Sequence, residues 1–142
     1  MIVFDADILS EVLKGKNFYV DRLKAIPERE RAITVVVFKE LIEGRILYIE
    51  HVETRPRKLS IASAFMLLQQ TAVFLRIFPL IPFTEEADRL VTEWKRTKNR
   101  VRVSDMRIAA SCIVADATLI SRNRRDFDLI PGLRVEYWND IT

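Results

Sequence analysis

The stretch that decides the fold is VSDMRIAASCIVADATLISRNRRDFDLIPGLRVEYW, residues 103–138. Small and medium-sized apolar residues recur at helical spacing over its first third, and Ser104 stands where a helix N-cap is expected. Strands are then predicted at 117–121 and 134–138, joined by a charged loop that contains a Pro-Gly pair. A closely packing helix followed by two strands is typical of an open α/β sheet.

The same alternation runs through the rest of the chain. Strands are predicted at 2–4, 32–37 and 78–83. Helices are predicted from Asp7 as the cap to near Gly15, over 18–25, 38–46 and 59–77, and from Thr84 as the cap onward, with a polar stretch at 51–58. The sequence therefore predicts an α/β protein with three α/β/α layers around a central, mostly parallel sheet.

Length and composition favour a single globular domain over residues 1–142. The chain is 49% apolar and 30% charged, and it holds only three Gly and five Pro without a biased segment that would mark a linker. The net charge of +3 is compatible with a polyanionic partner. The single cysteine, Cys112, lies among apolar residues and is predicted to be a buried thiol.

Targeting and membrane signals are not visible in the sequence. The opening residues carry no basic leader before an apolar stretch, which predicts a cytoplasmic protein. The most apolar stretch, 61–83, is interrupted by two Gln, one Arg and two Pro. Because these residues disfavour a membrane span, the stretch is interpreted as a core helix followed by a strand.

Three acidic residues occupy equivalent places in separate units. Asp5 ends the first strand, Glu40 lies in the first turns of the helix after the second strand, and Asp105 opens a later helix. Ligand sites of open α/β sheets lie outside the carboxyl ends of the strands, so these carboxylates are expected to share one cleft. Clustered carboxylates repel one another, and a hard cation such as Mg²⁺ or Mn²⁺ relieves that repulsion. The alternative is that Asp5 and Asp105 only cap helices and that Glu40 lies on a solvated face.

A carboxylate-bound metal agrees with what the sequence lacks. The only histidine is His51, so one chain cannot build a two-histidine acid-base pair or a Cys/His zinc site. A divalent ion activates water and neutralises the charge on a phosphodiester without a histidine or cysteine nucleophile. Metal-assisted hydrolysis is therefore the chemistry that the sequence favours.

Three segments carry a resemblance to a known family. FDADILSEVLKG (4–15) is similar to the strand-Asp-x-Asn-x-Leu opening of PIN domains, TVVVFKELIEG (34–44) to their strand and Glu-bearing helix, and 103–138 to their Asp-x-x-Ile-Ala-Ala helix, strand and Arg-Asn-x-x-Asp-Phe loop. The match spans nearly the whole chain. The sequence thus resembles PIN-domain ribonucleases, and among them the VapC toxins of toxin-antitoxin pairs.

The resemblance implies roles for individual residues. Asp5, Glu40 and Asp105 would be the catalytic residues that hold the metal. Asn123 stands where many relatives place a fourth acid, and Asp126 is the nearest carboxylate that could replace it.

The chain also departs from the family pattern beside these positions. Ala6 replaces the common Thr or Ser, and Asp7 replaces the usual Asn. Asp7 and Ser104 are expected to support the metal ligands, although Asp7 could instead serve as a helix cap.

A basic set accompanies the acids. The residues predicted to contact RNA phosphates are Lys14, Lys16, Arg107, Arg122, Arg124 and Arg125. The resemblance implies a homodimeric, Mg²⁺- or Mn²⁺-dependent endoribonuclease, inhibited by an antitoxin protein that places a basic side chain in the acidic cleft.

Two alternatives stay open at this stage. One is a catalytically weak PIN domain that binds RNA or protein, which the uncharged Asn123 suggests. The other is a phospho-acceptor signalling domain, which would need a lysine after a late strand, where 121–123 offers none.

Overall fold

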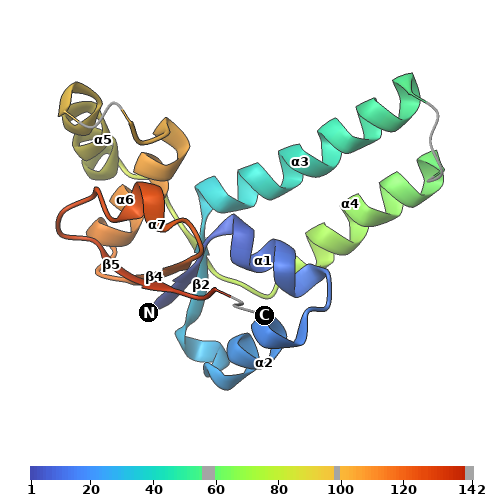
Figure 1. Cartoon of the computed structure of the whole chain (residues 1–142), viewed down its shortest axis with the longest axis horizontal. Coiled ribbons are helices and arrows are strands. Elements are labelled where there is room, and N and C mark those ends of the chain that lie inside the picture. Colours follow the sequence, from blue (N-terminus) through green and yellow to red (C-terminus); the bar gives the residue numbers. More distant parts are fainter. Residues whose placement is uncertain (56–59, 98–99, 140–142) are drawn as a thin grey trace.

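The fold is a parallel sheet flanked by helices. The computed structural model describes residues 1–55, 60–97 and 100–139. Its strands are β1 Ile2–Phe4, β2 Arg31–Thr34, β3 Leu80–Ile81, β4 Thr118–Ser121 and β5 Arg134–Tyr137. They form one five-stranded sheet in the order β3-β2-β1-β4-β5, and every pairing is parallel. The predicted α/β class and the mostly parallel sheet are confirmed (Figure 1).

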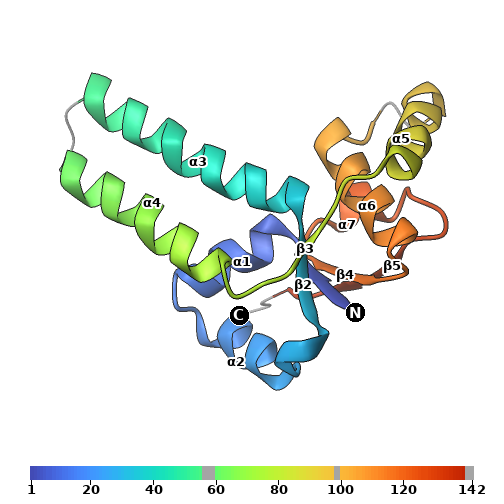
Figure 2. The same cartoon turned by 180° about the vertical axis from the view of Figure 1, so that it is seen from behind.

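Helices cover both faces of this sheet. Their bounds are α1 Ala6–Leu13, α2 Asn17–Ala25, α3 Val35–Thr54, α4 Ile61–Leu75, α5 Glu85–Thr97, α6 Val103–Val114 and α7 Arg124–Phe127, with a 3₁₀ turn at Glu28–Glu30. Figure 1 shows α1 and α2 on one face and α5, α6 and α7 on the other. The two layers of helices bury the central strands, as a parallel sheet requires. Seen from behind, α3 and α4 form a hairpin that projects from this body (Figure 2).

The central strands are buried, and they end at a common edge of the sheet. Val3 and Phe4 of β1, Ile33 of β2 and Leu119 of β4 have no solvent exposure. Because all strands run the same way, β1, β2 and β4 end at one edge of the sheet. Helix α6 leads back to β4, so its first turn lies at that edge as well. The predicted burial of Cys112 is also confirmed.

The second strand is shorter than predicted. It ends at Thr34, whose Oγ1 accepts a hydrogen bond of 3.0 Å from the backbone N–H of Val37 and so caps α3. The β-branched residues 35–37 are therefore helical, although their composition favours a strand. Helix α3 also continues to Thr54, so the predicted polar stretch is helical in its first part. Leu59, the predicted start of the next helix, lies outside the described residues.

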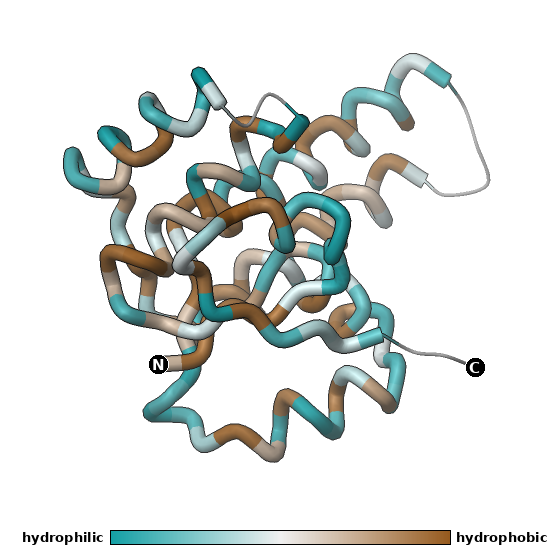
Figure 3. Tube along the Cα trace, turned by 60° about the vertical axis from the view of Figure 1, so that its left-hand side comes forward, coloured by the Kyte–Doolittle hydropathy of each residue, from teal (hydrophilic) through white to brown (hydrophobic). Residues whose placement is uncertain are grey.

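Helix α4 is not the core helix that its composition predicts. Ala64, Thr71 and Leu75 are buried on the side that faces α3. On the outer side, Phe65 and Met66 remain 53% and 58% exposed. Figure 3 shows hydrophobic segments continuing into the hairpin, away from the sheet. The hairpin therefore carries apolar surface that the chain itself does not cover.

In the part of the chain that the structure describes, no helix combines the length and the apolar character that crossing a membrane requires.

Candidate active site

A polar cleft lies at the carboxyl edge of the sheet. It encloses about 520 Å³. Its lining residues come from the start of α1 and its N-cap, from α3, from the start of α6 and the segment before it, and from α7 and its N-cap. The lining residues are Asp5, Ala6, Asp7, Glu40, Arg100, Arg102, Asp105, Asn123, Arg125 and Asp126. The structure thus brings together all five residues predicted to bind a metal, from segments more than one hundred positions apart in the sequence. Their role in metal binding stays a prediction.

Two hydrogen bonds position the buried carboxylate of Asp5 in the lining of the cleft. Its Oδ1 accepts a 2.8 Å hydrogen bond from the N–H of Ala6, so Asp5 is the N-cap of α1. Its Oδ2 accepts a 2.7 Å bond from the hydroxyl of Ser121, the last residue of β4. Burial, and then the nearby carboxylate of Asp7, raise the pKa of Asp5 to about 7. The cap therefore doubles as a buried acid without a cationic partner of its own among the described residues.

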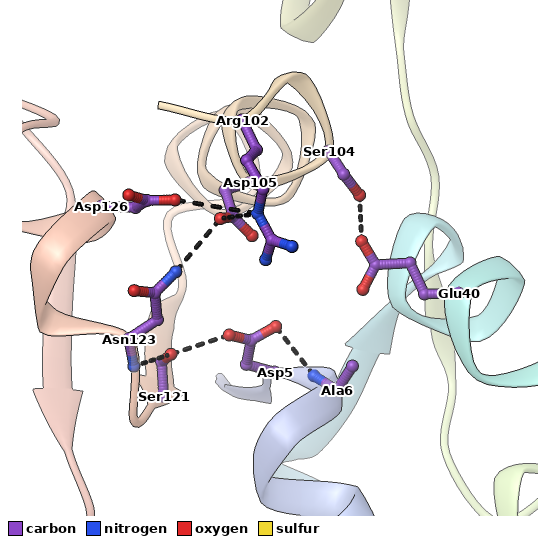
Figure 4. Close-up of polar contacts among 9 residues, drawn as sticks. All are labelled: Asp5, Ala6, Glu40, Arg102, Ser104, Asp105, Ser121, Asn123 and Asp126. Carbon is purple, nitrogen blue, oxygen red and sulfur yellow. Dashed lines mark hydrogen bonds and ion pairs between the residues drawn. The ribbon is translucent and has the colours of Figure 1, made fainter. Parts of the chain in front are cut away.

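The carboxylate of Asp105 contacts the side chains of Arg102 and Asn123 (Figure 4). Its Oδ2 accepts a 3.1 Å hydrogen bond from the Asn123 side-chain amide and lies 3.3 Å from Nε of Arg102. Burial and the hydrogen bond with Asp126 raise the pKa of Asp105 to about 7. The same hydrogen bond lowers the pKa of Asp126. The two neighbouring carboxyl groups therefore influence each other's pKa in opposite directions.

Glu40 reaches the cleft from the other side. It lies in the second turn of α3 and accepts a short hydrogen bond from the hydroxyl of Ser104. The prediction that Ser104 caps its helix is wrong, because α6 begins at Val103 and Arg102 occupies the N-cap position. Ser104 instead lies in the first turn, where it can orient Glu40.

Asp7 is also not a helix cap, because Asp5 takes that position. Asp7 lies in the first turn of α1, and its Oδ2 accepts a 3.1 Å hydrogen bond from the backbone N–H of Arg122. Burial raises the pKa of Asp7. Its Oδ1 is buried and has no hydrogen-bond partner among the described residues. A carboxylate oxygen left in this state favours a cation or a proton nearby.

The six basic residues predicted to bind RNA have different neighbours, and their role stays a prediction. Of the six, Arg125 lines the cleft. Arg107 lines a neighbouring groove next to Glu40. Arg124 lies over the ring of Tyr137 and near Asp128. The remaining three, Lys14, Lys16 and Arg122, surround Glu11 on α1.

The sequence analysis missed three residues of the site. Arg102 and Arg100 line the cleft, and Ser121 holds Asp5. Arg102 stands three positions before Asp105, a spacing at which side chains meet in a first helical turn, so this signal was available. Ser121 carried no comparable signal, because its partner is 116 residues away.

The donor set suits a hard divalent cation. Carboxylates of Asp5, Glu40 and Asp105, the amide of Asn123 and the carboxylate of Asp126 all offer oxygen, which Mg²⁺ and Mn²⁺ prefer. As the side chains stand, no three acids, histidines or cysteines in the described ranges are grouped closely enough to hold a metal. The residues therefore fit the ion by the chemistry of their oxygen atoms.

Fold and site together define a class: an open α/β domain with an acidic cleft at the carboxyl edge of its sheet. The family model for the PIN domain matches residues 2–133, and the chain belongs to the PIN-domain family. The predicted family is thus confirmed. The comparison with curated proteins found no match.

Several solved structures are similar to this chain in fold. A chain of a toxin-antitoxin complex from Klebsiella pneumoniae is 23% identical with a TM-score of 0.69, covering 94% of this chain and 95% of that one. A chain of VapBC2 from Rickettsia felis, bound to a promoter DNA fragment, is 23% identical with a TM-score of 0.72, covering 98% and 100%. A chain of DNA-bound VapBC from Salmonella typhimurium is 17% identical with a TM-score of 0.72, covering 97% and 98%. At these identities the similarity establishes a shared fold.

Proposed function

We propose that the chain is a metal-dependent endoribonuclease that hydrolyses RNA phosphodiester bonds. The observation that carries the proposal is the meeting of Asp5, Glu40 and Asp105, from three separate segments, in one cleft of a PIN fold. Burial raises the pKa values of Asp5 and Asp105 to about 7. Carboxyl groups with raised pKa values release protons when they bind a divalent cation, and the bound cation removes the repulsion between the carboxylates.

Each group in the cleft has a function in this reaction. Asp5, Glu40 and Asp105 would hold Mg²⁺ or Mn²⁺, with Asn123 or Asp126 as a further ligand. The bound ion would supply a nucleophilic water and neutralise charge on the phosphate. Ser121 and Ser104 orient Asp5 and Glu40 by hydrogen bonds. Arg125 at the rim is placed to attract the RNA backbone.

The direct test is cleavage of a structured RNA by the purified protein in Mn²⁺ or Mg²⁺. We expect cutting that stops in EDTA and in the Asp105→Asn variant, because both remove the bound ion. Lys39→Gln is a matched control, since Lys39 lies on α3 but pairs with Glu43 outside the cleft. Cleavage that persists in EDTA or in Asp105→Asn would refute a carboxylate-held metal.

A second candidate is a PIN domain with weak or no catalysis that binds RNA or protein. It is favoured by Asn123, which brings an amide to Asp105 where the family pattern has an acid. Calorimetry with Mn²⁺ separates the two, because the enzyme must bind the ion. Replacement Asn123→Asp should raise cleavage if the amide limits the activity, and should leave an inactive binding module unchanged.

We further propose that the protein is the toxin of a type II toxin-antitoxin pair and that it forms a homodimer. The similar folds in the VapBC complexes support the antitoxin partner. The exposed apolar side of α4, with Phe65, Met66 and Val73, supports a protein partner on the hairpin.

The mass of the protein in solution tests the dimer. Light scattering after size exclusion should give twice the mass of one chain for the natural protein and a lower mass for Phe65→Glu. Arg89→Glu on α5 is a control for a charge change elsewhere on the surface. An unchanged mass in Phe65→Glu would exclude this side of α4 as the interface.

The antitoxin partner is tested separately. Co-expression with the product of a neighbouring small reading frame should give a complex of the two proteins.

A further inference from the structure

Arg102 places a positive charge inside the acidic cleft. Its Nε lies 3.3 Å from Oδ2 of Asp105 and 3.9 Å from Oδ2 of Asp126. Figure 4 shows the guanidinium group pointing into the space between Asp105 and Glu40. The carboxylates of Asp105, Asp126 and Glu40 all raise the pKa of Arg102. Its side chain is nevertheless 74% exposed, whereas that of Asp105 is 3% exposed.

This arrangement differs from a structural ion pair. A guanidinium that is mostly hydrated pays little to leave its partner, and exposed pairs of this kind contribute little to stability. The buried carboxyl groups, in contrast, must be neutralised by a proton or compensated by a positive charge. Among the described residues, Arg102 is the cation that contacts the carboxylates in the cleft. In the described ranges, no three acids, histidines or cysteines are grouped closely enough to hold a metal while Arg102 is in this position.

We propose that Arg102 is a built-in counter-ion that competes with the divalent cation for Asp105 and Asp126. Without metal, the guanidinium group balances the carboxylates. When the ion binds, Arg102 moves out of the cleft, which its exposure allows, and the carboxyl groups close around the ion. Arg102 therefore sets the metal affinity of the site. The inference rests on the proposed metal-dependent function and deepens it.

The test is Mn²⁺ binding by calorimetry to EDTA-treated full-length protein. Arg102→Gln should tighten Mn²⁺ binding by roughly three- to tenfold, because it removes one positive charge within contact distance of the carboxylates. Arg125→Gln is the matched control: it loses the same charge from the lining of the same cleft, and Arg125 has no hydrogen bond or ion pair with a described residue. Arg102→Lys keeps the charge and should bind Mn²⁺ like the natural protein. Thermal melting in EDTA checks that each variant is folded.

The outcomes separate this inference from the proposed function. Tighter binding in Arg102→Gln alone supports the counter-ion, as does binding that appears only in that variant. Binding by the natural protein that is unchanged or weaker in Arg102→Gln overturns the counter-ion and leaves the metal-dependent function standing. An equal gain in Arg125→Gln does the same, since net charge would then explain it. No binding by any variant overturns both.

Discussion

Glu11 on α1 and the acids of the cleft are compensated in different ways, although Glu11, Asp105 and Asp5 are all buried. Glu11 is surrounded by three cations, with Lys14 Nζ at 3.4 Å, Arg122 Nη1 at 3.3 Å and Lys16 in closer contact. The hydrogen bond from Lys16 is the main cause that lowers the pKa of Glu11. The charge of this carboxylate is therefore compensated by cations of the chain itself.

The acids of the cleft show the opposite pattern. Burial raises the pKa values of Asp5 and Asp105 to about 7, and one exposed guanidinium, that of Arg102, is the compensating cation among the described residues. A protein that needed these acids only for stability could have surrounded them as it surrounds Glu11. The difference supports the proposal that a cation bound at the cleft supplies the missing charge.

The largest expected effect is on catalysis at Asp5. In Asp5→Asn, RNA cleavage in Mn²⁺ should fall by about 100-fold or more. Loss of a residue that only hydrogen-bonds to a metal ligand costs roughly 10- to 100-fold, and the loss of a ligand itself should cost more. Initial rates on a labelled RNA measure this. Glu11→Gln on the same helix should keep the natural rate. Equal losses in both variants would erase the proposed distinction between the two acidic groups.

The second effect is on stability at Glu11. Glu11→Gln should lower the free energy of unfolding by about 1–3 kcal/mol, because three cations lose their buried partner but remain partly hydrated. Urea denaturation in EDTA measures it. Asp5→Asn should be less destabilising at pH 8, since it removes a buried charge that lacks such partners. A stable Glu11→Gln variant would contradict the structural role of Glu11.

The third effect is on pH dependence. Asp5 and Asp105 titrate near pH 7 when folded and near their ordinary pKa of 3.8 when unfolded. Between these values the folded state binds more protons, so metal-free stability should fall as pH rises from about 4 to about 7 and then level off. Melting temperatures in EDTA should show a smaller fall in Asp5→Asn. Mn²⁺ should restore stability at pH 8. If the natural protein instead gains stability relative to Asp5→Asn as the pH rises from about 4 to about 7, the pKa of Asp5 is not raised.

The smallest effect is expected at a single cation around Glu11. Lys14→Met should change the free energy of unfolding by about 0.5 kcal/mol or less, because Lys14 is exposed and two other cations remain. Urea denaturation again measures it. A large loss would show that the cluster around Glu11 is not redundant.

Much of the fold was predictable from local pattern. The strands β1, β4 and β5 lie within one residue of their predicted bounds, because each is a short stretch with β-branched or aromatic residues that turn or charged residues flank. The boundary between β2 and α3 was not predictable from composition, since residues 35–37 favour a strand and only the cap at Thr34 makes them helical. The exposure of Phe65 and Met66 was not predictable either, because the apolar composition of α4 does not tell which of its sides the chain itself covers.

By itself, the sequence determined the alternation of strands and helices, the PIN-domain family and the acids Asp5, Glu40 and Asp105 as candidates, because these depend on residue type and short spacing. The tertiary structure alone decided which charges meet. It separated Lys14, Lys16 and Arg122 from the cleft, and it placed Arg102 within it. The physical reason is that burial and electrostatic pairing depend on distances between segments far apart in the chain, and only the packed sheet sets those distances.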